Sequence, residues 1–392
     1  MLDDDDENKF EMKGQTEMKH RILKAYLKPW LRKISQVDST LLFVDGFAGP
    51  GRYTDDSEGS PLLAMDMADA IVKSLDRIEE VKCVFVELEP ENHAQLSQEV
   101  DAKRKKVDDR ISATCKETGF ESWANEFIQE HTSKTPPPGL IFIDPFGYSG
   151  IPFDTISELY QLRDGAWEVL ITFMAGKMAQ WMEDQNHKQA ITKTLGTPDW
   201  ESEIRPSLSK DERAEKFSSF YQRQLRTKAG ARYTMPFEMK EESKRQICYY
   251  LIHATNKLDG LVVMKETMYN AGADDKFAYL GPDHSGYDDS QMSFTQFGGT
   301  DNFDQQVEDF ANSLHDRYKN EEMSFRDLLE VTFDKNIFKL THYRSAFDIL
   351  SERGELDVVH RPHLKDGNKS SGYGLDDLLQ FQKQSSLADY GF

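Results

Sequence analysis

The stretch LLFVDGFAGPGRY, residues 41–53, places the strongest constraint on how this chain folds. The apolar run from Leu41 to Val44 is typical of a parallel strand that is covered on both faces. Asp45 ends the run, and three glycines follow it at short intervals. Glycine lets the backbone approach a ligand closely or adopt positive φ. The stretch therefore predicts an α/β protein with a ligand site at the end of a buried strand.

Two other interpretations of the glycine turn remain open. A dinucleotide-binding turn has the spacing G-x-G-x-x-G and opens a helix, whereas this turn has G-x-x-G-x-G with Pro50 inside it. A purely structural turn is the second alternative. The stretch resembles the first motif of class I S-adenosylmethionine-dependent methyltransferases, in the form found in enzymes that methylate nucleic-acid amines. That resemblance implies cofactor contacts by Asp45, Gly46, Phe47, Ala48, Gly49 and Gly51.

Charge and composition restrict the possible partners. The 392 residues include 48 Lys and Arg against 69 Asp and Glu, a formal charge of −21, so a nucleic acid would need a local basic surface. The three cysteines have neither disulfide-framework nor zinc-site spacing, and we predict no metal site. Without a signal region or an apolar stretch long enough to span a membrane, we expect a cytoplasmic protein.

Helical periodicity from Thr16 to about Gln36 predicts an amphipathic helix packed beside the first strand. Lys19 and His20 are assigned to its solvated face, although they could reach a substrate. The basic run 103–106 and Lys265 are likewise interpreted as surface charges. Further along, Ser60 is expected to cap a helix that has Pro61 in its first turn.

Glu87 ends the next apolar run, Val81 to Val86. An acid at the tip of the second strand can accept two hydrogen bonds from ribose hydroxyls, and Glu87 is our candidate for this role. Glu89 is the local alternative, because strand ends are uncertain by ~2 residues. A third short strand over 110–114 leaves Glu117 as a weak candidate for contacting adenine.

LIFIDPFGYSG, residues 140–150, is the second informative stretch. A buried strand runs to Ile143, and in an open parallel sheet its end lies near that of the first strand. The Asp144 carboxylate and adjacent carbonyls could accept hydrogen bonds from an exocyclic amine while an aromatic ring stacks on the base. The candidate catalytic residues are Asp144, Pro145 and Phe146, with Tyr148 as a second stacking surface. Asp-Pro is also ordinary turn chemistry.

Three further strands are expected over 168–173, 232–237 and 246–254. Class I methyltransferases end their sheet with such a pair, one strand antiparallel to the rest. The predicted fold is therefore a Rossmann-like, mostly parallel sheet with the last strand antiparallel, in a domain spanning 15–280. The DPFG sequence resembles the corresponding motif of tRNA guanine-N2 dimethyltransferases.

The ordered combination of DGFAGPGRY, GSPLLA, FVELEP, FIDPFGYSG, EVLITFM, QLRTKAGARY, FEMK and HATNKLDGLVVMKETM resembles the three-Cys-motif partner family of bacteria and phages. The resemblance covers residues 16–280. It implies a radical-SAM-like partner that carries a three-cysteine motif, which this chain lacks.

The rest of the chain is predicted as an acidic disordered lead-in over 1–14, a linker over 281–302, a small domain over 303–376 and a tail over 377–392. Helices over 324–331 and 340–353, followed by a strand and a polar loop, suggest a winged helix. Nearby acids leave this segment almost neutral, and winged helices also bind proteins. The candidate nucleic-acid contacts are Lys339, His342 and Arg344 near the recognition helix, with Arg361 and Lys365 in the wing.

These patterns lead to one principal hypothesis and one from a different class. The principal hypothesis is an S-adenosylmethionine-dependent methyltransferase that acts on an exocyclic amine of a nucleic acid. The alternative is a non-catalytic accessory protein that docks the radical-SAM-like partner in phage defence or nucleic-acid modification. A nucleotide-dependent nuclease ranks below both, since the sequence has no P-loop or metal-ligand cluster.

Overall fold

The computed structural model describes residues 14–145, 151–163, 165–240, 246–272, 277–279, 300–336, 338–362 and 372–382. The chain divides into two compact units, Met1–Gly286 and Tyr287–Phe392, a boundary that falls within the predicted linker. Among the described helices, none is long and apolar enough to cross a membrane.

The larger unit is built on one eight-stranded sheet with the strand order β3-β2-β1-β4-β5-β7-β6-β8. The strands are β1 (Thr40–Asp45), β2 (Glu80–Glu87), β3 (Ile111–Glu117), β4 (Gly139–Ile143), β5 (Trp167–Phe173), β6 (Tyr233–Lys240), β7 (Ile247–Thr255) and β8 (Phe277–Tyr279). Strands β1 to β5 are parallel, and β7 pairs antiparallel with both β5 and β6. This is the Rossmann-like, mostly parallel arrangement with one antiparallel strand that the sequence predicted, extended by the short antiparallel strand β8.

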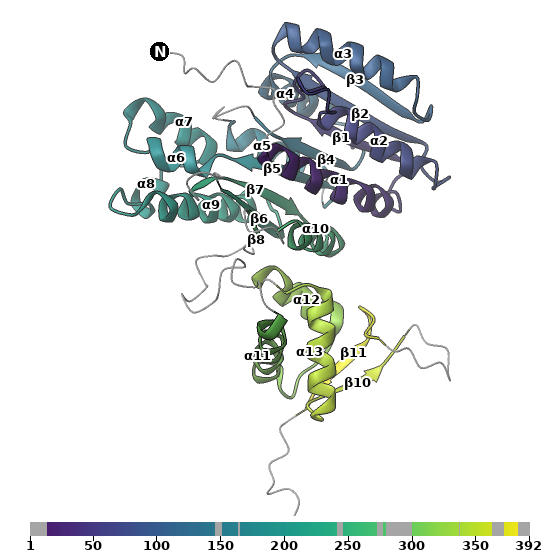
Figure 1. The fold of residues 1–392 in the computed structure, drawn as a ribbon, viewed down its shortest axis with the longest axis vertical. Helices are drawn as coiled ribbons and strands as arrows, with labels where there is room; N and C mark the ends of the chain where they lie inside the picture. Colours follow the sequence, from purple (N-terminus) through teal and green to yellow (C-terminus); the bar gives the residue numbers. More distant parts are fainter. Residues whose placement is uncertain are drawn as a thin grey trace, which may run out of the picture. The chain divides into compact units, whose positions relative to one another are not determined.

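Helices cover both faces of this sheet (Figure 1). On one face α1 (Gly14–Ile34) packs against α2 (Ser60–Val72) and α10 (Leu258–Ala271), and α3 (Pro90–Arg104) contacts α2. The other helices are α4 (Phe120–Glu130), α5 (Phe153–Gln161), α6 (Ala175–Trp181), α7 (Gln185–Leu195), α8 (Trp200–Glu203) and α9 (Lys210–Thr227). Their apolar faces join those of β1, β4, β5 and β7 in one continuous core. Burial on both faces explains why β1, β4 and β5 are almost wholly apolar.

Two local predictions were wrong in this unit. Ser60 is the first residue of α2, and the extended Gly59 is its N-cap, so Pro61 still lies in the first turn. Lys265 was assigned to the surface, but its side chain is fully buried on α10. Gly59 takes the N-cap position that was expected for Ser60, and the packing of α10 buries Lys265.

The smaller unit has the order α11 (Thr300–Tyr318), β9 (Glu322–Ser324), α12 (Phe325–Thr332), the 3-10 turn η4 (Phe333–Lys335), α13 (Leu340–Glu352), β10 (Leu356–His360) and β11 (Leu378–Phe381). Its three strands form an antiparallel sheet in the order β10-β11-β9. Ser324 caps α12 by accepting a hydrogen bond from the Asp327 amide. The sheet uses β11, so ordered structure continues past the predicted domain end at residue 376.

Candidate functional site

The glycine turn after β1 uses its own amides to fix its shape. Four consecutive amides, those of residues 46–49, donate hydrogen bonds within the protein. In chain order their acceptors are Phe142 O at 2.9 Å, Asp45 Oδ1 at 3.2 Å, Val86 O at 2.9 Å and Glu87 Oε2 at 2.8 Å. These amides are therefore not directed at an anion, as those of a dinucleotide-binding turn are.

Glycine is required at two positions of this turn. A Cβ on Gly46 would lie 2.6 Å from Cδ2 of Phe120, closer than side chains approach one another. Gly51 has φ +81°, in the region that favours glycine. The helix α2 begins only at Ser60, well after the turn, which is a second departure from the dinucleotide pattern.

Asp45 is fully buried at the end of β1. Burial raises its pKa to about 7, and the charges of Asp144 and Glu87 add to this increase. The Ser60 hydroxyl and the Phe47 amide work in the opposite direction. The Oδ2 atom has no partner with hydrogen-bond geometry among the described residues. Asp45 thus offers one buried acceptor oxygen to a ligand that carries a donor or a positive charge.

Glu87 lies at the end of β2, where the sequence predicted it. Its Oε2 accepts the Gly49 amide at 2.8 Å, and its Oε1 accepts the Glu89 amide at 2.8 Å. The side chain therefore anchors the glycine turn, a role that the sequence did not indicate. A carboxylate has about four acceptor sites, so both oxygens retain capacity for ribose hydroxyls.

The two other acids considered for the cofactor lie near Glu87 but are exposed. Glu89 is the N-cap residue of α3. The strand β3 runs to Glu117, beyond the predicted end at residue 114, and Glu117 stands opposite Glu87 in the β2–β3 register. Glu117 thus occupies the tip of the third strand, near which the sequence predicted the contact with adenine.

Asp144 follows β4 directly and is already engaged. Lys19 Nζ lies 2.7 Å from Oδ1 and 2.5 Å from Oδ2, and the Thr172 hydroxyl donates to Oδ1 at 2.6 Å. The ion-paired side chains are only 11% and 16% exposed. Assigning Lys19 to a solvated helix face was therefore wrong. Helical spacing could have corrected this assignment, since it places Lys19 on the buried face of α1 with Leu23, Tyr26 and Trp30.

His20 is buried beside this ion pair, so its assignment to the solvated face was also wrong. Burial lowers its pKa to about 4, and the Lys19 and Lys24 charges lower it further while Asp144 raises it. The imidazole is consequently neutral at pH 7. Its Nε2 lies 3.5 Å from the Tyr53 hydroxyl. A neutral histidine is able to accept or donate a hydrogen bond at this position.

Three side chains that the sequence did not single out complete the surroundings of Asp144. Thr172 is a buried polar residue within the apolar strand β5, which was the available signal for it. The Lys19 ammonium lies 5.4 Å from the ring centroid of Tyr249 on β7, within the range of a cation–π contact. Burial, with the charge of Asp144, raises the pKa of Tyr53 above its usual range.

The strand-end loops meet as expected, because β1 lies between β2 and β4. Asp45 pairs in register with Phe85 on one side and Phe142 on the other. Pro145 is buried next to Asp144, while Phe146 and Tyr148 lie outside the described residues. Within the described residues there is no group of three or more His, Cys, Asp or Glu side chains placed to hold a metal ion.

The predicted contacts of the smaller unit differ in exposure. His342 is buried, and its Nδ1 accepts the Lys339 amide at 3.2 Å, so it helps to cap α13. Half-buried Arg344 donates to Tyr373 O at 3.3 Å, and half-buried Arg361 donates to Gly372 O at 2.8 Å. Lys339 is also half-buried, and Lys365 lies outside the described residues.

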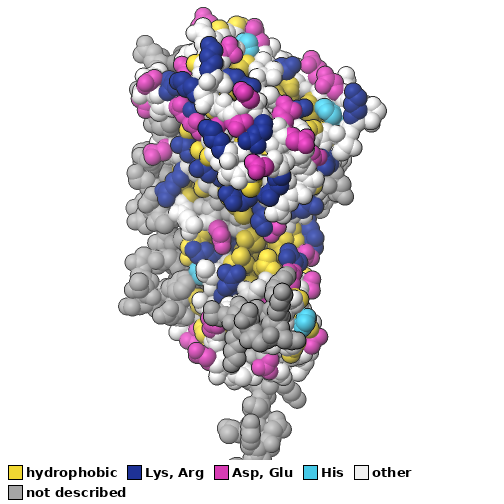
Figure 2. Space-filling model, turned by 90° about the vertical axis from the view of Figure 1, so that its right-hand side faces the viewer, with side chains coloured by type: hydrophobic (Ala, Val, Ile, Leu, Met, Phe, Trp, Pro, Cys, Tyr) yellow, Lys and Arg dark blue, Asp and Glu magenta, His cyan; other side chains and the backbone are white. Residues whose placement is uncertain are grey.

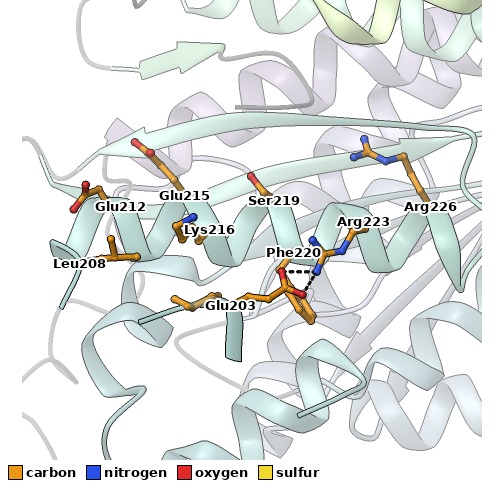
Figure 3. A pocket seen from close by; sticks show the side chains of 10 residues that line it. Glu203, Leu208, Glu212, Glu215, Lys216, Ser219, Phe220, Arg223 and Arg226 are labelled. Carbon is orange, nitrogen blue, oxygen red and sulfur yellow. Dashed lines mark hydrogen bonds and ion pairs between the residues drawn. The ribbon is translucent and has the colours of Figure 1, made fainter. Parts of the chain in front are cut away.

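A separate cavity of about 460 Å³ lies along α9. Figure 3 shows Arg223 pointing toward Glu203, and the two form an ion pair with distances of 2.6 and 2.7 Å. Burial raises the pKa of Glu215, which also lines it, to about 7. None of the candidate residues named above lines this cavity. Of its two arginines, Arg223 is paired with Glu203 and Arg226 donates to the Thr234 hydroxyl at 2.8 Å, so we assign the cavity no function.

No protein-family model matches the chain, and no curated protein matches it. Solved structures that it resembles include a protein named as an rRNA-methylase from Clostridium thermocellum, with 10% identity, 62% of this chain and 98% of that chain covered, and a TM-score of 0.31. The methyltransferase domain of bacterial CtHen1 has 8% identity to this chain and a TM-score of 0.29, with 60% of this chain and 98% of that chain covered. The plantazolicin methyltransferase BamL, in complex with SAH, has 12% identity to this chain and a TM-score of 0.27, with 62% of this chain and 86% of that chain covered. Because these values are low, the fold assignment rests on the strand order itself.

Proposed function

We propose that the larger unit is an S-adenosylmethionine-dependent methyltransferase. One observation carries this proposal: the four amides of the glycine turn are used internally, while Oδ2 of Asp45 has no hydrogen-bond partner among the described residues. A turn with these properties favours a ligand with a positive group over one with a pyrophosphate. S-adenosylmethionine carries an ammonium group and no phosphate.

The residues at the strand ends fit this cofactor. Asp45 would hold the ammonium of its amino-acid part, with the glycine turn beside it, and Glu87 would accept the ribose hydroxyls. The bound cofactor supplies an activated methyl group, so no protein nucleophile is needed. The chain's contribution would be to align the acceptor with that methyl group and to exclude water.

The acceptor that we propose is an exocyclic amine of a nucleic acid. Asp144 follows β4 next to the glycine turn, and its carboxylate could accept a hydrogen bond from the amine. Lys19 and Thr172 fix the orientation of this carboxylate and leave some of its lone pairs available. Pro145 would restrict the backbone, and Phe146 would stack on the base.

The smaller unit is proposed to be a winged helix that binds nucleic acid. Its element order and three-stranded antiparallel sheet support this proposal. The positions of Arg344, Arg361 and Lys339 are compatible with phosphate contacts, and Lys365 belongs to the proposed wing. The burial of His342 leaves it a capping role instead.

A second candidate function is favoured by one observation. Asp144 already accepts hydrogen bonds from Lys19 and Thr172, which makes it a less available acceptor for an amine. The chain would then bind the cofactor without transferring its methyl group. It would serve as an accessory protein for the radical-SAM-like, three-cysteine partner that the family resemblance implies.

Calorimetry with S-adenosylmethionine tests the cofactor assignment. We expect binding by the wild type, a loss for Asp45→Ala, and no change for Asp101→Ala, an exposed acid on α3. Equal binding by all three proteins, or no binding by the wild type, would contradict the assignment.

Transfer of a labelled methyl group to pools of DNA, tRNA and rRNA tests the reaction. Label transferred by the wild type and lost with Asp144→Ala supports the methyltransferase. If the cofactor binds but no pool is labelled, and a co-expressed three-cysteine partner copurifies with the chain, the accessory function is favoured.

A further inference from the structure

A surface groove of about 760 Å³ lies where α1 and α2 meet, next to the candidate site. His20 is one of the residues that line it, and the same residue contacts Tyr53 beside the ion pair of Asp144. Half-buried Met67 of α2 contributes apolar surface to it, and the buried Leu63 also lines it. The groove therefore adjoins the candidate site at His20 and runs along α1.

Three basic side chains of α1 line this groove: Arg21, Lys24 and Lys28. They lie at positions i, i+3 and i+7 of the helix, so they share one face. All three are exposed. Lys24 and Lys28 are one turn apart, ~6 Å along the helix axis, and among the described residues no acid forms an ion pair with either of them.

Two acids also line the groove, but they do not cancel this charge. Glu58 is paired with Lys103 at 3.0 Å and with Arg52 at 3.6 Å. Glu17 is a single exposed carboxylate one turn before Arg21. The groove therefore has an excess of positive charge, although the whole chain carries −21. Figure 2 looks onto the side where α2 and α3 lie in Figure 1, and shows Lys and Arg side chains on this face of the larger unit with Asp and Glu side chains among them.

We propose that this groove is the track for the phosphate backbone of a single-stranded nucleic acid. Lys24 and Lys28 would contact phosphates, and the half-buried Met67 would receive sugar or base faces. A positively charged groove that follows the backbone is one of the two usual elements of single-strand binding, the other being aromatic side chains on which bases stack. A single strand is preferred over a duplex because the target amine must leave the base stack to reach Asp144.

This inference deepens the proposed function, since the track would deliver a nucleotide to the strand-end site. His20 connects the two, because it lines the groove and its pKa responds to the charges of both Lys24 and Asp144. A neutral imidazole at this junction would not repel a base that enters the site.

Binding of labelled oligothymidine and oligouridine to the full chain, measured by fluorescence anisotropy without cofactor, tests the track. For the variant Lys24→Gln/Lys28→Gln we expect weaker binding and a flatter salt dependence than for the wild type. Each phosphate contact to a single strand contributes ~0.7 to the logarithmic salt slope, so two lost contacts remove ~1.4. The wild type should then lose ~7-fold more affinity than the variant between about 50 and 200 mM salt.

The matched control is Lys105→Gln/Lys106→Gln, which removes the same charge from exposed lysines at the end of α3. Wild-type binding and salt slope in this control support the track, and the DNA and RNA oligomers show which backbone it prefers. An equal loss in the control, no oligomer binding by the wild type, or equally tight binding of a duplex overturns the inference. Calorimetry with S-adenosylmethionine on the same proteins keeps this outcome separate from the cofactor assignment, because exposed lysines of the groove should not affect it.

Discussion

Replacing Lys19 by methionine should destabilise the larger unit strongly, because it leaves the Asp144 carboxylate without its cation. The Lys19 ammonium contacts both carboxylate oxygens, at 2.7 and 2.5 Å, and the two side chains are only 11% and 16% exposed. Truncating one partner of a buried ion pair costs about 3–5 kcal/mol. We expect about 3 kcal/mol, the lower end of this range, since Asp144 keeps the Thr172 hydroxyl.

Tryptophan fluorescence during urea unfolding is a suitable assay for this change. All five tryptophans, Trp30, Trp123, Trp167, Trp181 and Trp200, belong to the larger unit, so the signal reports on that unit alone. A loss of about 3 kcal/mol corresponds to a midpoint lower by about 1 M urea for a slope near the upper end of the usual range. The control Lys28→Met lies exposed on the same helix and should change stability by about 0.5 kcal/mol or less.

The double variant Lys19→Met/Asp144→Asn separates the ion pair from simple packing. Removing both charges should recover much of the stability that the single variant loses, because no unpaired buried charge remains. A midpoint for Lys19→Met equal to that of Lys28→Met would refute a stabilising role of this ion pair. It also fails if the double variant is no more stable than the single one.

Three further predictions concern the strand-end site. The affinity of the wild type for S-adenosylmethionine should fall about tenfold per pH unit below pH 7, since the pKa of Asp45 is raised to about 7 and only its carboxylate attracts the ammonium. Calorimetry should show no such dependence for Asp45→Asn, and a parallel fall in both proteins would contradict the role. Gly46→Ala should cost about 1–3 kcal/mol of stability and so lower the melting temperature, because its Cβ would lie 2.6 Å from Cδ2 of Phe120. A melting temperature equal to that of the wild type would refute the predicted clash. Between pH 6.5 and 4, His20 binds a proton in the unfolded chain but not in the folded one, because its pKa in the folded chain is lowered to about 4. Acidification over this range should therefore lower the free energy of unfolding of the wild type by up to about 3 kcal/mol, and His20→Gln should not show this loss. Identical slopes of unfolding free energy against pH for the wild type and His20→Gln would exclude this role of His20.

Strand ends were predictable because they depend on local pattern. The apolar run before Asp45 and the run before Asp144 each had to be a buried strand, and parallel strands end at one edge of a sheet. The acids that follow them could therefore be assigned to one site from residue order alone. The same logic found Glu87, although not its hydrogen bonds to the glycine turn.

The sequence by itself determined the buried strands, the glycine turn and the acids at the strand ends, since each is encoded within a few consecutive residues. The tertiary structure alone decided what surrounds those acids. Lys19, Thr172 and Tyr249 come from α1, β5 and β7, and they gather at Asp144 only because the sheet brings these distant segments together. Burial then fixed the charge of His20 and the raised pKa of Asp45, since the pKa of a side chain depends on neighbours and solvent that no local pattern specifies.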